Sequence, residues 1–177
     1  MLLIISSIWV NIKMAFDITL HHRRSIRLRH YDYAQTGFYF LTICTFHRVP
    51  IFGRVIDGAM VLNDAGVIAD AQWQATREMR ANVELHDCVI MPNHMHGILE
   101  ITAANDVARD ATLGDMVRGY KSAVTKQVRA QQRDAALSVW QRGFYENVIR
   151  CEGAYLAMSE YIQTNPQRWK DDIYFAK

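Results

Sequence analysis

The 177-residue chain is predicted to be an α+β protein in which helices pack on an antiparallel sheet. Three observations predict this class. Short aromatic and β-branched runs alternate with segments of helical periodicity. Turn signals between neighbouring runs are tight enough to join adjacent strands. The composition, 50% hydrophobic and 11% aromatic, is typical of a globular chain with a buried core.

The first predicted elements are a strand, a hairpin and a helix. Residues 37–46 are rich in aromatic and β-branched types, as expected of a central strand. Residues 51–62 carry Asp57-Gly58 between short apolar pieces, which is a hairpin signal. Asn63 or Asp64 is expected to cap a helix that reaches about Ala81, because apolar residues recur there at helical spacing.

The second half of the chain is predicted to contain three further strands and two further helices. Strands over about 84–91 and 94–102 are joined tightly through Pro92-Asn93, and residues 103–111 are a linker candidate. The remaining predicted elements are a helix from the Thr112 cap to about Arg133, a strand over 140–149 that contains Gly143, and a helix over 152–165 that Pro166 stops.

The chain is predicted to be a single domain over residues 14–177. Residues 1–13 are apolar but lack a basic start and are too short to span a bilayer, so we interpret them as a disordered tail or a misassigned start. Three cysteines in apolar or mixed surroundings, Cys44, Cys88 and Cys151, fit a reduced cytoplasmic protein rather than a disulfide framework. No membrane partner is expected.

The most informative motif is His94-Met95-His96, which lies in a predicted strand. Side chains alternate along a strand, so both imidazoles leave the same face and converge, as in a metal site. A third ligand must then come from elsewhere. Glu100 shares the face but lies well along the strand, whereas Tyr161 and Asn165 are four residues apart and share one face of the last helix.

Two basic blocks point to an anionic partner in a chain whose net charge is only +2. Residues 21–30 contain Arg23, Arg24, Arg27 and Arg29 without an acidic residue, and residues 116–133 contain Arg118, Lys121 and three further basic residues, again without one. For either block the alternative is a solvated face.

These motifs resemble the REP-associated tyrosine transposases, which are IS200/IS605-like Y1 transposases of the HUH endonuclease superfamily. The resemblance extends over about residues 23–172. It rests most specifically on Met91-Pro92-Asn93-His94-Met95-His96-Gly97 and on Tyr161-Ile162-Gln163-Thr164-Asn165-Pro166. The other matching segments are Arg23-Arg24-Ser25-Ile26-Arg27-Leu28, Tyr31-Asp32-Tyr33, Gly37-Phe38-Tyr39-Phe40-Leu41-Thr42, Tyr120-Lys121-Ser122 and Trp140-Gln141-Arg142.

The resemblance implies a ferredoxin-like α/β sandwich and a metal-dependent DNA transposase-endonuclease. It implies that His94, His96 and Asn165 are the metal ligands, and that Tyr161 is the nucleophile that forms a 5′-phosphotyrosine and releases a 3′-OH. It implies Mg²⁺ or Mn²⁺, whereas imidazole ligands alone favour Mn²⁺, Zn²⁺ or other transition ions. Three neutral ligands leave the ion its full charge, which favours an anionic phosphate as the missing ligand.

The expected partner is single-stranded or hairpin DNA, of the REP-like palindromic kind that the resemblance implies. Arg118 and Lys121 are expected to contact phosphates of a hairpin stem, and Arg23, Arg24, Arg27 and Arg29 to read bases near its foot. The protein is expected to be nucleoid-associated, as a monomer or a homodimer. One alternative is a domesticated REP-hairpin-binding protein with little or no cleavage. The short chain and single nucleophile position disfavour another, an HUH replication initiator or relaxase.

Overall fold

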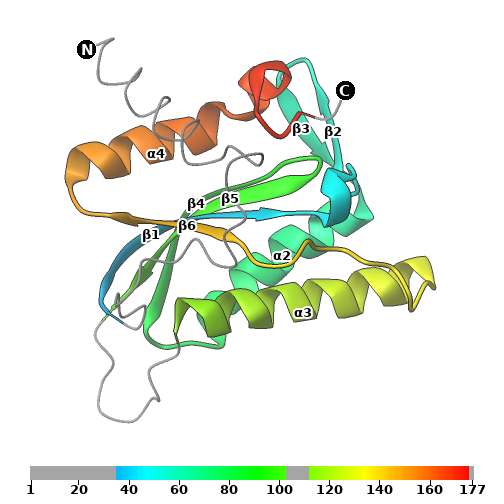
Figure 1. Cartoon of the computed structure of the whole chain (residues 1–177), viewed down its shortest axis with the longest axis horizontal. Helices are drawn as coiled ribbons and strands as arrows, with labels where there is room; N and C mark the ends of the chain where they lie inside the picture. The colour runs from blue at the N-terminus through cyan, green and yellow to red at the C-terminus, as the bar shows by residue number, and fades with distance from the viewer. Residues whose placement is uncertain (1–34, 103–111, 176–177) are drawn as a thin grey trace. The chain divides into compact units, whose positions relative to one another are not determined.

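The computed structural model of this chain describes residues 35–102 and 112–175. The predicted tail over 1–13, the four arginines of the first basic block and the linker over 103–111 lie outside these residues. In the described part, four strands form an antiparallel sheet in the order β4 (Val83–Ile90), β5 (His94–Ile101), β1 (Gly37–Cys44) and β6 (Tyr145–Ile149) (Figure 1). Strands β2 (Gly53–Ile56) and β3 (Ala59–Leu62) form a separate hairpin.

Helices cover both faces of the sheet. Helices α2 (Asp64–Glu78) and α3 (Leu113–Gln132) lie side by side on one face, and α4 (Glu152–Thr164) lies on the other (Figure 1). Without the hairpin and α4, the chain runs strand, helix, two strands, helix, strand, and the strand order is that of a ferredoxin-like βαββαβ fold. The predicted fold class is therefore confirmed.

The centre of the sheet is formed by β1 and β5, the two strands with the most continuous apolar sequence. Cys44 pairs with His94 and Thr42 with His96 in the antiparallel register. Side chains alternate along each strand, so Thr42 and the two histidines face α4 while Leu41 and Met95 face α2 and α3. Leu41 and Met95 are completely buried.

The element boundaries differ from the predicted ones for local reasons. Strand β6 begins at Tyr145 rather than residue 140, because Gly143 adopts a left-handed φ of 77° that interrupts an extended strand. Trp140 instead forms an isolated bridge to Thr45, just beyond the end of β1. Helix α2 ends at Glu78 rather than about Ala81, and Met79, which is 63% exposed, is its C-cap.

The predicted turn and cap signals are present. Asp57 and Gly58 both adopt positive φ (49° and 75°), as the two-residue turn of the β2–β3 hairpin requires. Asn63 caps α2 by accepting a hydrogen bond from Gly66 N (3.0 Å), and Thr112 forms a capping box at the start of α3. Among the described helices, none is both long and apolar enough to cross a membrane.

Gly97, directly after the second histidine, lets α2 approach the sheet. A Cβ atom there would lie 2.7 Å from Cζ2 of Trp73, which is 1% exposed and packed on all sides. We expect Gly97→Ala to lower the free energy of unfolding by about 1–3 kcal/mol, because the buried indole has no room to move. Urea unfolding measures this. Gly153→Ala is the control, since a Cβ there meets nothing within 4 Å; equal stabilities of the two variants would contradict the packing argument.

Candidate active site

The two histidines of β5 converge on the face that α4 covers. His94 and His96 are 0% and 2% exposed, and their Nε2 atoms lie 3.1 Å apart. Nδ1 of His94 lies 2.9 Å from Oδ1 of Asn93. Because an amide oxygen only accepts hydrogen bonds, Nδ1 carries the proton and Nε2 of His94 presents a lone pair to the other ring. Thr42 Oγ1 lies 2.9 Å from Nδ1 of His96 and can donate there, which leaves the proton of His96 on Nε2, facing the lone pair of His94.

Helix α4 brings the two predicted residues of the last helix to this pair. The hydroxyl of Tyr161 lies 3.3 Å from Nε2 of His96. Asn165, one turn further on, is 1% exposed, and its Oδ1 is buried without a hydrogen-bond partner in the described part of the chain. The structure thus brings together His94, His96, Tyr161 and Asn165, and their chemical roles stay predictions.

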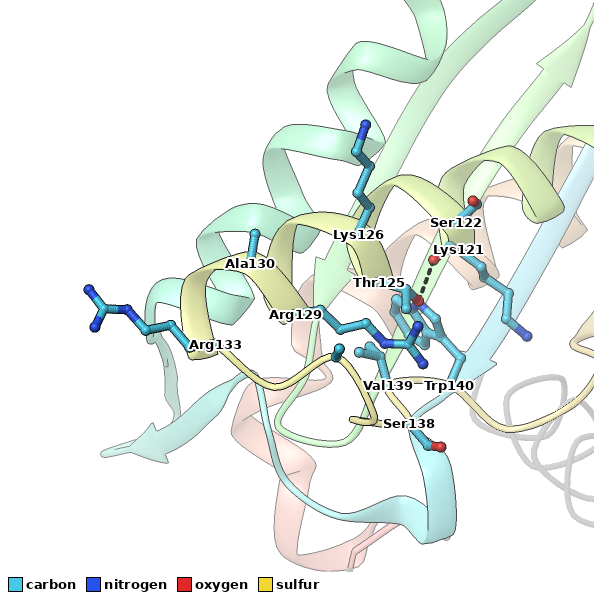
Figure 2. A pocket seen from close by; sticks show the side chains of 11 residues that line it. Lys121, Ser122, Thr125, Lys126, Arg129, Ala130, Arg133, Ser138, Val139 and Trp140 are labelled. Atoms are coloured by element: carbon cyan, nitrogen blue, oxygen red, sulfur yellow. Dashed lines mark hydrogen bonds between the residues drawn. The ribbon is translucent and has the colours of Figure 1, made fainter.

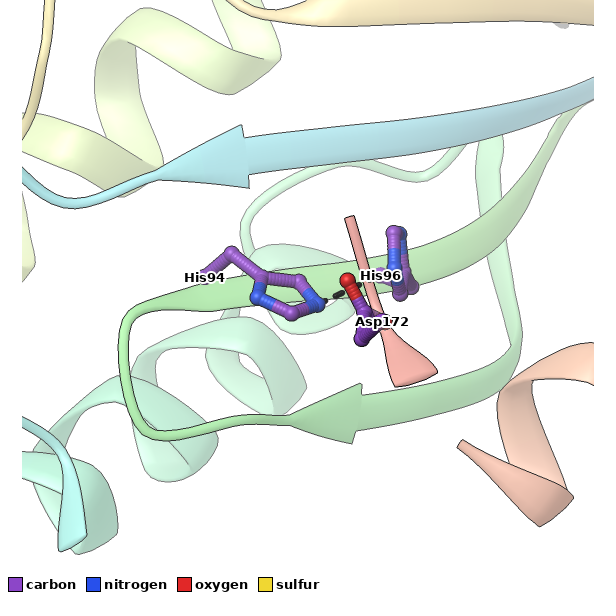
Figure 3. A group of neighbouring side chains, drawn as sticks. All are labelled: His94, His96 and Asp172. Carbon is purple, nitrogen blue, oxygen red and sulfur yellow. Dashed lines mark hydrogen bonds between the residues drawn. The ribbon is translucent and has the colours of Figure 1, made fainter. Parts of the chain in front are cut away.

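Asp172 completes the group, and no sequence motif indicated it. It follows the 3₁₀ helix η2 (Pro166–Asp171), in an irregular segment without motif spacing. Its Oδ2 accepts hydrogen bonds from Asn165 Nδ2 (2.9 Å) and the Tyr161 hydroxyl (3.4 Å). One ligand atom from each of His94, His96 and Asp172 lies within 4.8 Å of the others, with Asp172 directed at the space between the rings (Figure 3).

Burial controls the charge state of the group. It lowers the pKa of His96 to about 3 and holds the pKa of His94 well below its usual value, so both rings are neutral at pH 7. Burial also raises the pKa values of the Tyr161 phenol and the Asp172 carboxyl. Neutral imidazoles, a carboxylate and an unpartnered amide oxygen are all electron-pair donors. The buried group could therefore hold a metal ion.

The C-terminal segment covers this group. The Tyr174 ring centroid lies 4.6 Å from that of His94, and Tyr174 N donates to Oδ1 of Asp172 (2.7 Å). Asn93 Nδ2 donates to the Tyr174 carbonyl oxygen (2.7 Å), and Arg48 donates to the carbonyl oxygen of Ile173 (3.3 Å). As a result, each side chain of the group is at most 9% exposed.

A β-bulge in β4 positions α4 on the sheet. The register between β4 and β5 shifts between Leu85 and Cys88, and Asp87 lies in that shift. Its two carboxylate oxygens accept hydrogen bonds from Ser159 Oγ (2.7 Å) and Gln163 Nε2 (3.0 Å). The bond from Gln163 contributes most to lowering the pKa of Asp87. The two donors lie two residues before and after Tyr161, so Asp87 sets where the helix places the phenol.

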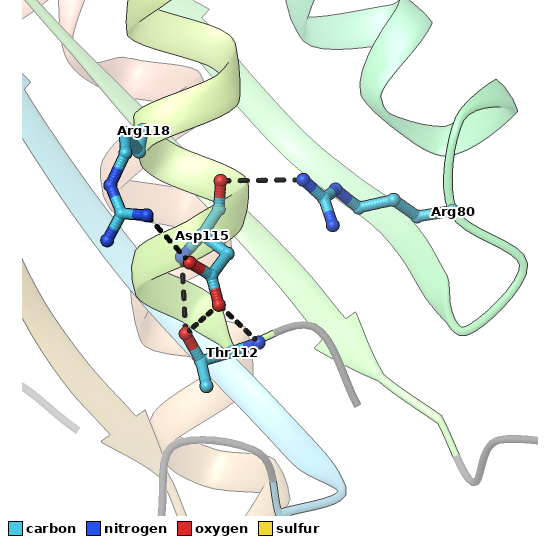
Figure 4. Close-up of polar contacts among 4 residues, drawn as sticks. All are labelled: Arg80, Thr112, Asp115 and Arg118. Atoms are coloured by element: carbon cyan, nitrogen blue, oxygen red, sulfur yellow. Dashed lines mark hydrogen bonds and ion pairs between the residues drawn. The ribbon is translucent and has the colours of Figure 1, made fainter. Parts of the chain in front are cut away.

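Other residues that the sequence singled out lie outside the group. Glu100 is 3.4 Å from Nε2 of His86, so its carboxylate is engaged away from the histidine pair. Arg118 pairs with Asp115 (3.0 Å), and its side chain is 80% exposed (Figure 4). Lys121 donates to the carbonyl oxygens of Gln141 (2.7 Å) and Gly143 (2.9 Å), so its ammonium group joins α3 to the segment before β6.

No protein-family model matches the sequence. An uncharacterized protein of Haemophilus influenzae (strain Rd) is 39% identical to this chain over 173 residues, which cover 89% of this chain and 95% of that protein. The chain belongs to the family of this Haemophilus protein. Among solved structures, a REP-associated tyrosine transposase bound to a REP hairpin matches with a TM-score of 0.60 and 21% identity, over 81% of this chain and 73% of that one. The chain therefore has the fold of that transposase, as the sequence predicted.

The buried neutral histidines predict a pH dependence of stability. The folded pKa of His96, about 3, lies below the usual unfolded value of about 6.5. The unfolded state therefore binds more protons below pH 6.5, and the metal-free protein loses stability as pH falls below that value. We expect about 1.4 kcal/mol per pH unit for each such histidine, measured by urea unfolding in EDTA at pH 7, 6 and 5.

The control is His96→Gln, which removes one titrating ring. The raised pKa of Asp172 acts in the opposite sense and is common to both proteins, so the comparison isolates the histidine. The variant should show a shallower loss of stability between pH 6.5 and 5, and equal slopes would mean that His96 is protonated in the folded state.

Proposed function

We propose that this chain cleaves and rejoins single-stranded or hairpin DNA, with Tyr161 as the nucleophile and a divalent metal ion as cofactor. The observation that carries the proposal is the placement of the Tyr161 hydroxyl 3.3 Å from His96, beside a buried group of metal donors. A phenol that attacks phosphorus needs this arrangement, because phosphoryl transfer depends on positioning and on neutralising charge. The shared fold with a REP-associated tyrosine transposase supports it.

The donors present fit a divalent ion. His94, His96 and Asp172 would hold it, and Asn165 Oδ1, which is buried and unpartnered in the described structure, would be a further donor. The carboxylate adds a hard oxygen ligand to the two imidazoles, which favours Mn²⁺ or Mg²⁺ more than the imidazoles do alone. When bound, such an ion polarises a phosphate oxygen and orients the scissile bond.

The reaction transfers one phosphoryl group and is balanced without a further reactant. The Tyr161 oxygen forms a bond to phosphorus, the bond from phosphorus to the 3′ oxygen breaks, and the leaving strand takes up a proton as a 3′-OH. Burial keeps the phenol protonated before attack, because it raises the pKa of Tyr161. Asp172 Oδ2 accepts a hydrogen bond from that hydroxyl (3.4 Å) and is in position to take the proton. Attack by another 3′-OH reverses the step and rejoins the strands.

We propose REP-like palindromes as the substrate, because the transposase that shares this fold is bound to a REP hairpin. A helix-borne tyrosine needs an accessible backbone, which an unpaired strand or a hairpin foot provides. The C-terminal segment must move for such a strand to reach Tyr161, since Tyr174 covers His94. That closure favours a second candidate function, a hairpin-binding protein that seldom or never cleaves.

Substitution of the nucleophile decides between the two functions. We expect the full-length protein to form a covalent adduct with a labelled hairpin oligonucleotide in Mn²⁺, visible on a denaturing gel, and Tyr161→Phe to form none. Tyr155→Phe is the matched control, because this tyrosine lies on the same helix but contacts His86 instead (3.2 Å). A wild-type protein that binds the hairpin yet gives no adduct in Mn²⁺ or Mg²⁺ would refute the enzymatic proposal and leave the binding function.

Removal of the Asp172 carboxylate tests the metal group without reference to activity. We expect Asp172→Asn to weaken Mn²⁺ binding about tenfold or more in isothermal titration calorimetry, because a buried charged donor is lost. Asp171→Asn makes the same charge change at the neighbouring exposed position and should bind Mn²⁺ within twofold of the wild type. If both variants bind Mn²⁺ equally well, the Asp172 carboxylate is not a ligand.

A further inference from the structure

The basic side chains of α3 fall into two groups with different contacts. Arg118 and Lys121, in the N-terminal half, are engaged with Asp115 and with two carbonyl oxygens. Lys126, Arg129 and Arg133 follow at spacings of three and four residues, which places them on one face of the helix. Of these three side chains, only that of Arg129 makes a hydrogen bond within the described residues. We call these three residues the distal basic face.

The distal basic face borders an open hollow of about 780 Å³ between α3 and residues 135–140. Arg129 is directed toward Val139 and Trp140, and a bond from its Nε to the carbonyl oxygen of Leu137 (2.9 Å) fixes it there (Figure 2). Lys126 and Arg133 extend outward at the rim (Figure 2). The remaining polar lining comes from Lys121, Ser122, Thr125 and Ser138, and none of the described residues that line the hollow is acidic.

The spacing of these cations fits a polyanion. From Lys126 to Arg133 a helix rises about 10 Å, and one strand of B-form DNA carries a phosphate about every 3.4 Å along its axis. The length of the distal basic face therefore corresponds to about three base-pair steps of rise along a duplex, so its cations can contact more than one phosphate. Arginine, lysine and hydroxyl groups are the usual donors to phosphate oxygens, whereas a small monoanion would use only one of the cations.

The wall of the hollow is joined to the end of the sheet at which the histidine pair begins. Trp140 forms a bridge to Thr45, Val139 O accepts a hydrogen bond from Phe46 N (3.0 Å), and Gln141 N donates to Cys44 O (3.1 Å). Cys44 is also the register partner of His94. The hollow borders α3 and the candidate active site lies under α4, and these two helices cover opposite faces of the sheet (Figure 1). Both sites meet the same end of β1.

We propose that the distal basic face binds the sugar-phosphate backbone of the paired stem of a DNA hairpin. The stem then lies against α3, and the unpaired foot passes around the end of the sheet toward Tyr161. This inference rests on the proposed function for its choice of DNA, and it adds where the stem is held. It also moves the expected stem contacts from Arg118 and Lys121 to the other half of the helix.

The test is a binding measurement with cleavage removed. The full-length protein, as Tyr161→Phe, is titrated with a labelled hairpin bearing a single-stranded foot, and fluorescence anisotropy is followed from 50 to 300 mM salt. We expect Lys126→Gln/Arg133→Gln to lower hairpin affinity about tenfold at 0.1 M salt. The slope of log affinity against log salt should fall by about 1.8, because each lost phosphate contact removes about 0.9. An unpaired oligonucleotide with the foot sequence should lose little affinity.

The matched control is Arg77→Gln/Arg80→Gln, which removes two positive charges at the end of α2, near the start of α3. It should bind the hairpin within twofold of its Tyr161→Phe parent. If both double variants lost the same hairpin affinity, the effect would be one of net charge alone. If only the affinity for the unpaired oligonucleotide fell, the hollow would bind single strands. Either result overturns the proposal. Because no step requires an adduct, failure of Tyr161 to react would leave this result unaffected.

Discussion

The orientation of His94 depends on one buried amide, that of Asn93, and the rest of the candidate site depends on that orientation. Asn93 Nδ2 donates to the carbonyl oxygens of Arg48 (3.1 Å) and Tyr174 (2.7 Å), so its Oδ1 must face the His94 ring. The backbone oxygen of Asn93 accepts from both N and Oγ1 of Thr45 (2.9 Å each). A single residue therefore links the turn before β5, the end of β1 and the C-terminal segment to the position of the His94 lone pair.

The electrostatics of the site follow from that burial. The group is rich in electron pairs. Both imidazoles are neutral because burial lowers their pKa values, the Asp172 carboxyl has a raised pKa, and the amide oxygen of Asn165 has no hydrogen-bond partner among the described residues. A buried carboxylate is costly to leave without a compensating charge. A divalent cation relieves this cost, and the phenol of Tyr161 then lies next to the point where an incoming phosphate would be neutralised. The proposed roles of the metal and the nucleophile are thus physically coupled.

Periodicity predicted most of the fold, because strand alternation and helical spacing are local properties. The same alternation was enough to place His94 and His96 on one face, and four-residue spacing was enough to pair Tyr161 with Asn165. Asp172 could not be found this way, since it follows an irregular 3₁₀ segment and meets the histidines only through tertiary contacts. Counting basic residues in the sequence likewise could not show that Lys121 donates hydrogen bonds to two backbone carbonyls. Nor could it show that the side chains of Lys126 and Arg133 extend away from the helix.

The covered site and the distal basic face bear on one question that the proposed function raises, which is how a DNA strand would displace the C-terminal segment. Hydrogen bonds from Arg48 and Asn93 hold that segment, and the guanidinium group of Arg48 lies 5.2 Å over the Tyr174 ring. Hydrogen bonds of this kind are each worth about 1 kcal/mol. An unpaired DNA strand without a stem would compete with the C-terminal segment only at the concentration of that DNA in solution. A foot attached to a stem already bound at α3 competes at an effective concentration of the order of millimolar, which favours opening by hairpins over opening by unpaired strands.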